Sequence, residues 1–466
     1  MKIYLKERNM IKVSLISEPN VNAEDLIAFG ARSCYQPTEP KIGEKMDIKS
    51  RLFDVGHHTT FQHGHYTFFI EGIAIGDLTL GLHLTNVFYN SSQRSGRFCS
   101  QMFVSPDFDE IAGYLNYYDL NIREFIGAMD YLASGFRIYN RHLAKAESLA
   151  RKFIREERPN ASDSYIVQNA LKIAQEQLRV FIPVILPTAL TYTINLSALA
   201  ALYHTAWSSP LMDLTQQMAD LILKKNPNLN FIFSRSERER QGLPMIRRFL
   251  SDSGCGISLK PHSQVVSFGD FQYFQVPNRQ DLWPIDLLPF EPAFMDNNTQ
   301  ELKTDVEISL ATMGQDQRHR TVRRGQPIFT GNFYLPPLPR CLDLEADALA
   351  LMNKWKENIF GNPNIPLTLA CSLAPYGAMV KYRKSASYNA LAHEFFKRLC
   401  WCTQEEIYHA SVQVVEQIKS HLGPDSPLLA AMKPPCAMSG VCGEGKRYCG
   451  RDIAESVRNP FTERKV

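Results

Sequence analysis

The stretch Gly56–Phe98, GHHTTFQHGHYTFFIEGIAIGDLTLGLHLTNVFYNSSQRSGRF, surrounds one apolar run with histidines, hydroxyls and a glycine-arginine turn. Tyr66–Ile73 is aromatic, apolar and partly β-branched, which predicts a buried strand. Ile75–Leu84 carries apolar residues at roughly helical spacing, which predicts a helix. We therefore expect the polar side chains of this stretch to gather at the ends of a strand and a helix.

The far end of the stretch has the chemistry of an anion site. Ser95 offers a hydroxyl, Gly96 lets backbone N–H groups approach a ligand, and Arg97 offers a guanidinium fork suited to phosphate. Taken alone, the tripeptide is more simply a surface turn. Its meaning depends on the residues that accompany it.

Composition places the chain among ordinary globular proteins. Its 466 residues favour two domains, and 44% hydrophobic with 21% charged residues is typical of a soluble fold. The net charge of +3 gives no support for a general nucleic-acid binder, although arginine clusters can hold the phosphates of a small molecule. Neither a GxGxxG nor a GxxxxGK[ST] element occurs, so a Rossmann fingerprint or P-loop is not supported.

The sequence lacks targeting and membrane signals. Charges interrupt every apolar run of the N-terminal MKIYLKERNMIKVSLI, and no apolar stretch reaches the roughly 18–20 residues that span a bilayer. We therefore expect a cytoplasmic protein without a membrane partner. Cys436, Cys442 and Cys449 bunch in a glycine-rich tail, but their spacing is not the usual zinc pattern. Reduced thiols are favoured over a metal site there, with the metal kept as the alternative.

Periodicity predicts a chain rich in helices. KVSLI predicts an opening strand, and a helix should contain Leu26–Ala31. Further helical segments are expected over Ile111–Arg155, Asp163–Val180 and, after a break at Pro183 and Pro187, Leu190–Tyr203.

Several short motifs occur in a particular order: ARSCY at Ala31–Tyr35, GHHT at Gly56–Thr59, QH at Gln62–His63, YTF at Tyr66–Phe68 and SGRF at Ser95–Phe98. This order resembles the flavin-dependent thymidylate synthases, whose pattern is ARxxY, GHxSxxEHxxFTF and RHRx(7–8)SxRY. The family's RHR falls at His83-Leu84-Thr85, where this chain has no arginine.

The missing signature appears later. Thr304–Gln317 again reads as a strand followed by a helix, and Gln315-Asp316-Gln317-Arg318-His319-Arg320 matches the family's QxxRHR. We interpret the chain as a tandem duplication. The expected units are a first copy over 1–230, a linker or crossover over 231–280, a second copy over 281–432 and a Cys/Gly-rich tail over 433–466. The resemblance implies an α/β (α+β) fold of two related units, each a mainly antiparallel sheet with long helices.

Later family motifs can also be placed on both halves. Arg179 leads RVFIP, and Asn195 follows Pro183 by the family's twelve positions (195 − 183 = 12). In the second half Cys371 replaces the arginine and Ser387 the asparagine, yet Arg398-Leu399 and Thr403–Ile407 remain. The arginine of the family's NxR is absent from both halves.

The two halves keep complementary residues. The first retains Thr59, Ser95, Gly96, Arg97 and Arg179, and the second retains Gln315, Arg318, His319, Arg320, His393 and Arg398. Family sites are built from several copies, so residues missing from one copy can be supplied by the other. We therefore expect a composite site.

The resemblance implies FAD as cofactor and dUMP, methylenetetrahydrofolate and NADPH as further ligands, in the reductive methylation of dUMP to dTMP. It implies a homodimer in place of the family's tetramer. By position, Arg179 and Arg398 take the uracil edge as catalytic residues, while substrate binding falls to Ser95, Gly96, Arg97, Gln315 and Arg318. The implied cofactor-binding residues are Thr59, Arg318, His319, Arg320 and His393.

Two other readings stay open. A catalytically silent relative would serve as a binding or scaffold protein, and would be colourless where the enzyme would be yellow. An arginine cluster that binds nucleic acid would give oligonucleotide binding that depends steeply on salt.

Overall fold

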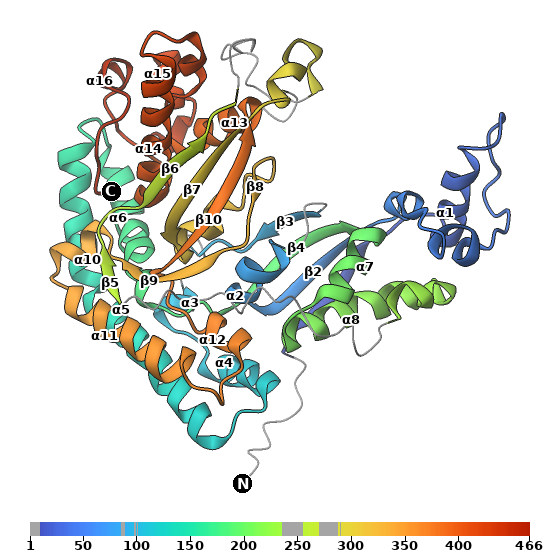
Figure 1. The fold of residues 1–466 in the computed structure, drawn as a ribbon. Coiled ribbons are helices and arrows are strands. Elements are labelled where there is room, and N and C mark those ends of the chain that lie inside the picture. The colour runs from blue at the N-terminus through green and yellow to red at the C-terminus, as the bar shows by residue number, and fades with distance from the viewer. Residues whose placement is uncertain are drawn as a thin grey trace.

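The computed structural model describes residues 10–84, 89–96, 99, 101–234, 255–269, 288 and 290–466. Within these residues the strands form two sheets that lie side by side (Figure 1). The mixed α/β fold with mainly antiparallel sheets, expected from the sequence, is confirmed.

The first sheet has the order β1-β2-β4-β3, with all neighbours antiparallel. Its strands are β1 (Lys12–Ser17), β2 (His65–Ala74), β3 (Tyr89–Gln93) and β4 (Pro187–Asn195). The buried strand predicted over Tyr66–Ile73 is therefore correct. The helix expected to resume at Leu190 is wrong up to Asn195, because TALTYTIN alternates buried and β-branched residues between two partner strands. The helix begins only after Asn195, whose side chain caps it.

The second sheet has the order β5-β9-β10-β7-β6, and the short β8 also pairs with β10. Its strands are β5 (Gly256–Ser258), β6 (His262–Ser267), β7 (Glu301–Ser309), β8 (Arg323–Arg324), β9 (Ile328–Tyr334) and β10 (Ala378–Ser387). The linker expected over 231–280 is corrected for 256–267, because those residues pair with β9 and β7. Residues 235–254 and 270–280 lie outside the described residues.

The two sheets share one antiparallel strand order. The sequence β1-β2-β4-β3 recurs as β6-β7-β10-β9, with strands taken in the order first, second, fourth and third along the chain. In each sheet a helix follows the second strand directly, because Ile75 begins α2 after β2 and Leu310 begins α9 after β7.

Helices cover both sheets, and the helical segments predicted over 111–155 and 163–180 correspond to α4, α5 and α6. Their bounds are α1 (Ala23–Arg32), α2 (Ile75–Asp77, continued by a π-helical turn over Leu78–Leu82), α3 (Gln101–Val104), α4 (Phe108–Leu115), α5 (Ile122–Glu157), α6 (Asp163–Leu178), α7 (Leu196–Thr205), α8 (Ser209–Leu223), α9 (Leu310–Asp316), α10 (Pro337–Cys341), α11 (Glu345–Lys354), α12 (Leu367–Ser372), α13 (Tyr388–Arg398), α14 (Glu405–Leu422), α15 (Pro435–Ser439) and α16 (Ile453–Arg458). Helices α7 and α8 pack against the first sheet, and α13 and α14 against the second (Figure 1). No helix in the described part of the chain has the length and apolarity needed to cross a membrane.

The two halves meet through a symmetric backbone contact. Pro183 and Pro375 form an antiparallel bridge. Val184 N donates to Ala374 O at 2.9 Å, and Tyr376 N donates to Ile182 O at 2.8 Å. One continuous hydrophobic core runs across this junction, where the rings of Phe181 and Phe333 lie 5.6 Å apart. The halves are therefore packed together as one body.

The C-terminal tail returns to the first half of the chain. Lys465 N donates to the Glu157 carboxylate at 2.9 Å, and Gln177 Nε2 donates to Lys465 O at 2.6 Å. Val466 is 2% exposed. The tail thus packs on α5 and α6 while its cysteines face the second half.

Candidate functional site

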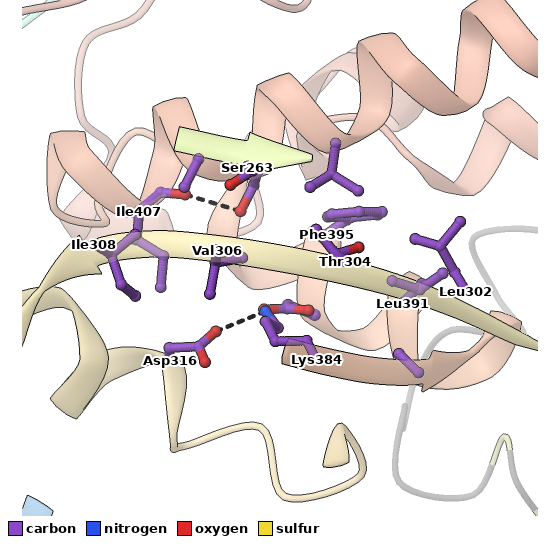
Figure 2. Close-up of a pocket in the computed structure, with 15 residues that line it drawn as sticks. Ser263, Leu302, Thr304, Val306, Ile308, Asp316, Lys384, Leu391, Phe395 and Ile407 are labelled. Atoms are coloured by element: carbon purple, nitrogen blue, oxygen red, sulfur yellow. Dashed lines mark hydrogen bonds and ion pairs between the residues drawn. The ribbon is translucent and has the colours of Figure 1, made fainter. Parts of the chain in front are cut away.

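The arginine-histidine segment 318–320 follows the C-terminal end of α9 and is fixed by a buried charge cluster. Asp316, the last residue of α9, accepts from Arg324 Nε at 2.5 Å, Lys384 Nζ at 2.7 Å and Tyr382 Oη at 2.7 Å. Arg324 also donates from Nη1 to the backbone oxygen of His319 at 2.9 Å. Figure 2 shows Asp316 and Lys384 facing each other at the edge of a small apolar pocket under β7. The cluster holds the turn that carries Arg318 and Arg320.

The charge state of this cluster follows from its partners. Burial works to raise the pKa of Asp316, but the charges of Arg324 and Lys384 outweigh it and hold that pKa well below its usual range. The same ion pair raises the pKa of Arg324. Asp316 is therefore an anion that pairs with two buried cations, Arg324 and Lys384, and Lys384 also pairs with the buried carboxylate of Glu394. The role of Asp316 is structural.

From this turn the guanidinium groups reach across to β3 of the first sheet. Arg320 donates to Asn90 Oδ1 at 2.8 Å and to Ser91 Oγ at 2.9 Å, and its guanidinium lies 5.0 Å from the centre of the Tyr89 ring. Arg318 donates to Gln93 Oε1 at 3.3 Å. Residues separated by more than 220 positions thus form one polar surface.

A second junction joins the halves at Gln404. Its side-chain oxygen accepts from Arg179 Nη2 at 3.2 Å and from Gln315 Nε2 at 2.5 Å. Arg398 Nη2 donates to the backbone oxygen of Gln315. A Cβ added to Gly96 would lie 3.7 Å from Arg179 Nη1, so the Ser95-Gly96 turn borders this junction as well.

The two predicted histidines lie together behind the arginines. The rings of His319 and His393 are 5.0 Å apart in a T-shaped arrangement. Burial, and then the charge of Arg398, hold the pKa of His319 well below its usual value. His319 is therefore neutral and presents one donor and one acceptor nitrogen.

His83 occupies the matching turn of the first half. Its Nε2 lies 3.1 Å from Ser91 Oγ, and its ring stacks on Tyr89 at 5.5 Å. Burial, together with the charges of Arg318 and Arg320, lowers the pKa of His83 to about 3. The neutral imidazole of His83 thus stands where the family motif has an arginine. Arg318 and Arg320 from the other half lie close to this position.

Several of these donors have spare capacity. Within the described residues, Arg179 Nε, Arg320 Nε and His319 Nδ1 are buried without a hydrogen-bond partner. Arg179, Arg318 and Arg320 form no ion pair with a carboxylate in that part of the chain. Buried donors usually have partners, so the arrangement suits an anionic ligand with several oxygens. These residues therefore fit a phosphate-bearing cofactor and nucleotide.

A pocket of about 740 Å³ opens beside this group. Arg318, His319 and Arg398 line this pocket together with residues 400–403 and residues of the C-terminal tail. A volume of this size is ordinary for a small-molecule site. Within the described part of the chain, no group of three or more His, Cys, Asp or Glu side chains is placed to hold a metal ion.

Not all predicted residues converge. Thr59 is exposed in the 3-10 helix His58–His63, ahead of β2. Arg320 contacts Asn90 and Ser91 of β3, which through β4 lie level with Thr67 and Phe68 near the start of β2, two strands away across the sheet. Arg97 lies outside the described residues. Ser95 is partly buried, and its backbone oxygen accepts from Cys99 N at 2.8 Å.

Five residues that build the site were not among the predicted site residues: Gln404, Asp316, Arg324, Asn90 and Ser91. Gln404 and Asp316 lie inside the family motifs at 403–407 and 315–320, and Arg324 follows Asp316 by eight residues, which is only a weak signal for an ion pair. The bridging role of Gln404 depends on the packing of the two halves.

Comparison with known proteins bears on this arrangement. Residues 14–226 match the family model described as thymidylate synthase complementing protein. The resemblance to the thymidylate synthase family is confirmed for this half. No curated protein matches the chain. The thymidylate synthase family match ends at residue 226, so the relationship of the second half to this family rests on its motifs and strand order.

Solved structures of related proteins are also similar to this chain. Thymidylate synthase X (ThyX) from Helicobacter pylori, solved with FAD and dUMP, is 17% identical with a TM-score of 0.29, over 48% of this chain and 100% of that one. A UMP/dUMP methylase, PolB from Streptomyces cacaoi, bound with 5-Br dUMP, is 19% identical with a TM-score of 0.29, over 46% of this chain and 91% of that one.

Proposed function

We propose that this chain is a tandem flavin-dependent thymidylate synthase that methylates dUMP reductively to dTMP at a site drawn from both halves. The observation that carries the proposal is the junction at Gln404, where Arg179 of the first half meets Gln315 of the second. Each half alone lacks part of the family's set of residues. The contacts that join Arg179, Gln315 and Arg398 around Gln404 support a site to which both halves contribute.

Tandem duplication is supported by the shared strand order and by the junction between the halves. Pro183 and Pro375, which occupy the same motif position, pair with each other. The flanking hydrogen bonds exchange equivalent residues, as expected of a local two-fold relationship. In such a pair each copy can lose what the other copy supplies. The replacement of arginine by His83 beside Arg318 and Arg320 is one instance.

The ligand roles follow from the donors. Arg318, Arg320 and the neutral His319 would hold FAD, which supplies the hydride chemistry when bound. Ser95, Gly96 and Arg97 would take the dUMP phosphate, with Gln315 and Arg318 also on the substrate. Arg179 and Arg398 would face the uracil edge, where guanidinium groups stabilise negative charge on the ring oxygens.

The protein's contribution is therefore positional and electrostatic. The buried guanidinium groups hold the uracil in one orientation and exclude water from its edge. Gln404 fixes Arg179 by accepting from Nη2 and leaves Nε of that residue available. Methylenetetrahydrofolate as methylene donor and NADPH as reductant belong to the same proposal.

The silent-relative alternative rests on the missing NxR arginine. Ser197 takes its place in the first half. In the second half, Asn389 is 2% exposed and donates to the backbone oxygen of Phe294 at 3.0 Å. That position is committed to packing and has no ligand role. The chain must therefore work with Arg179 and Arg398, or it does not catalyse the reaction.

The test is direct. Purified protein should show a flavin spectrum and, with dUMP, methylenetetrahydrofolate and NADPH, should form dTMP. Colourless protein that FAD does not stabilise against heat would support the silent relative.

Assembly as a homodimer is the remaining part of the proposal. Thr59 is exposed in the 3-10 helix before β2, where a second chain could contact it. The dimer would then stand in for four single copies.

A further inference from the structure

The tail and the start of α14 bring together cysteines that the proposed reaction does not use. Five of them line the 740 Å³ pocket: Cys400, Cys402, Cys436, Cys442 and Cys449. Three lie in the tail and two just before α14, so the fold adds a second set that sequence spacing did not connect. All five are in the reduced, thiol state.

Two of these thiols are in direct contact. The side chains of Cys402 and Cys449 are hydrogen-bonded to each other, and Cys402 Sγ also lies 3.8 Å from the backbone oxygen of Arg447. Cys449 is 6% exposed but borders the pocket, which gives a small reagent access. Cys400 also contacts Cys402, although a disulfide between residues two apart is strained.

Three buried guanidinium groups surround the pair. Arg158, Arg451 and Arg464 are 2%, 4% and 4% exposed. They bind backbone carbonyls and aromatic rings: Arg158 and Arg464 both donate to Trp401 O at 3.2 Å, and Arg451 lies 4.4 Å from the centre of the Trp401 ring. None forms an ion pair with a carboxylate within the described residues.

Such an environment favours a thiolate. Buried cations without carboxylate partners need a compensating anion, and cationic neighbours activate cysteine. The hydrogen bond from Cys402, with the charges of Arg158 and Arg464, lowers the pKa of Cys449 to about 6 against the effect of burial. A low-pKa thiol beside a second thiol is the arrangement of a redox-active pair.

We propose that Cys402 and Cys449 are a redox-active dithiol that a peroxide oxidises reversibly to a disulfide. The Cys449 thiolate attacks one peroxide oxygen, the O–O bond breaks, and the leaving hydroxide takes up a proton to become water. The sulfenic acid formed on Cys449 is then attacked by Cys402 Sγ. The S–O bond breaks, the second hydroxide takes the Cys402 proton as water, and the S–S bond forms. The two thiols lose two electrons and the peroxide gains two.

The disulfide would connect the tail to the site. Cys402 is two positions before Gln404, and Thr403 Oγ1 donates to Arg398 O at 3.2 Å. A covalent bond at Cys402 therefore restrains the segment that joins Arg179, Gln315 and Arg398. This inference does not rest on the proposed function, because disulfide formation is measured without FAD or dUMP.

Peptide mapping under non-reducing conditions tests it. The full-length protein is treated with hydrogen peroxide and digested, and a Cys402–Cys449 cross-linked peptide that disappears with dithiothreitol is expected. Cys402→Ser and Cys449→Ser should each abolish it, and Cys449→Ser should also remove rapid labelling by a thiolate-selective reagent at pH 7. Cys341→Ser, at an exposed cysteine outside the cluster, is the control and should leave the cross-link intact.

Three results would overturn the proposal. One is a peroxide-treated protein in which both thiols stay reduced. Another is a cross-link that joins other pairs, such as Cys400 with Cys402 or Cys436 with Cys442. The third is stoichiometric zinc or iron in the purified protein that protects the thiols from labelling. Circular dichroism of each variant separates a lost cross-link from a lost fold.

Discussion

The guanidinium of Arg179 donates from Nη2 to Oε1 of Gln404 at 3.2 Å, across 225 positions of sequence. Gln404 is 1% exposed, and its oxygen also accepts from Gln315. A neutral amide beside Arg179 orders the guanidinium without neutralising it. The charge of Arg179 therefore remains available to a ligand, and the predictions below follow from that property.

Replacing the bridge by a carboxylate should oppose ligand binding. Gln404→Glu places a negative charge beside Arg179, where it competes with an anionic ligand for the guanidinium. We expect dUMP affinity to fall by about tenfold or more, since a charge-assisted hydrogen bond contributes about 1.5–3 kcal/mol. Calorimetric titration with dUMP measures this. Gln404→Met is the uncharged control and should lose less affinity than the glutamate; equal or tighter binding by Gln404→Glu would argue against an anion at this junction.

Flavin binding should depend on the second half's arginines. Arg318→Ala or Arg320→Ala removes one charge-assisted contact, so FAD affinity should fall by about one to two decades. Arg323→Ala is the matched control, because that side chain is 69% exposed and pairs with Glu301 at the surface. Fluorescence titration with FAD measures all three variants. Unchanged affinity in both Arg318→Ala and Arg320→Ala would remove the cofactor assignment.

Stability should depend strongly on Asp316. Asp316→Ala leaves Arg324 buried without its ion-pair partner and leaves Lys384 paired with Glu394 alone, and breaking a buried ion pair in this way costs about 3–5 kcal/mol. Urea denaturation measures the loss. Asp305→Ala, which removes the partner of the exposed Arg383, should change the unfolding free energy little by comparison. Similar losses in the two variants would show that the Asp316 cluster does not fix the turn.

The free energy of unfolding should also fall as the pH rises, because Glu406 loses its proton. Burial, and then the charge of Glu405, raise the pKa of Glu406 from its ordinary value of 4.5 to about 7. Because the pKa of Glu406 is higher in the folded protein, the contribution of this side chain to the unfolding free energy is fully present below pH 4.5. It is lost as the pH rises through about 7. Glu406→Gln should flatten that part of the stability profile. The unfolding free energy of both proteins at intervals from pH 4.5 to 8 checks the sign, and a profile unchanged by the substitution would contradict it.

Local sequence patterns predicted the elements whose neighbours are close in the chain. The strand from Tyr66, the helix after it and the long α5 follow directly from apolar periodicity. β4 was missed because its apolar residues suit either helix or strand, and its two partner strands decide the outcome. β5 and β6 were missed because their charged, proline-containing surroundings resemble a linker.

The sequence predicted several residues of the candidate site but not the contacts between them. Family motifs selected Arg179, Gln315 and Arg398, and the structure brings these together. The bridge at Gln404 depends on contacts between segments more than 80 positions apart, for which no local pattern exists. Thr59 illustrates the opposite case, because its motif is clear while the structure leaves its side chain exposed in the 3-10 helix before β2.

A double-mutant cycle on Arg179 and Arg398 tests the composite site most directly. The dUMP dissociation constant would be measured with FAD present for the unmodified protein, Arg179→Ala, Arg398→Ala and the double variant. If both halves hold one nucleotide, each single change weakens binding by about tenfold or more, and the two losses fail to add by about 0.5–3 kcal/mol. Binding that depends on only one of the two arginines, or losses that add, would contradict a site shared between the halves.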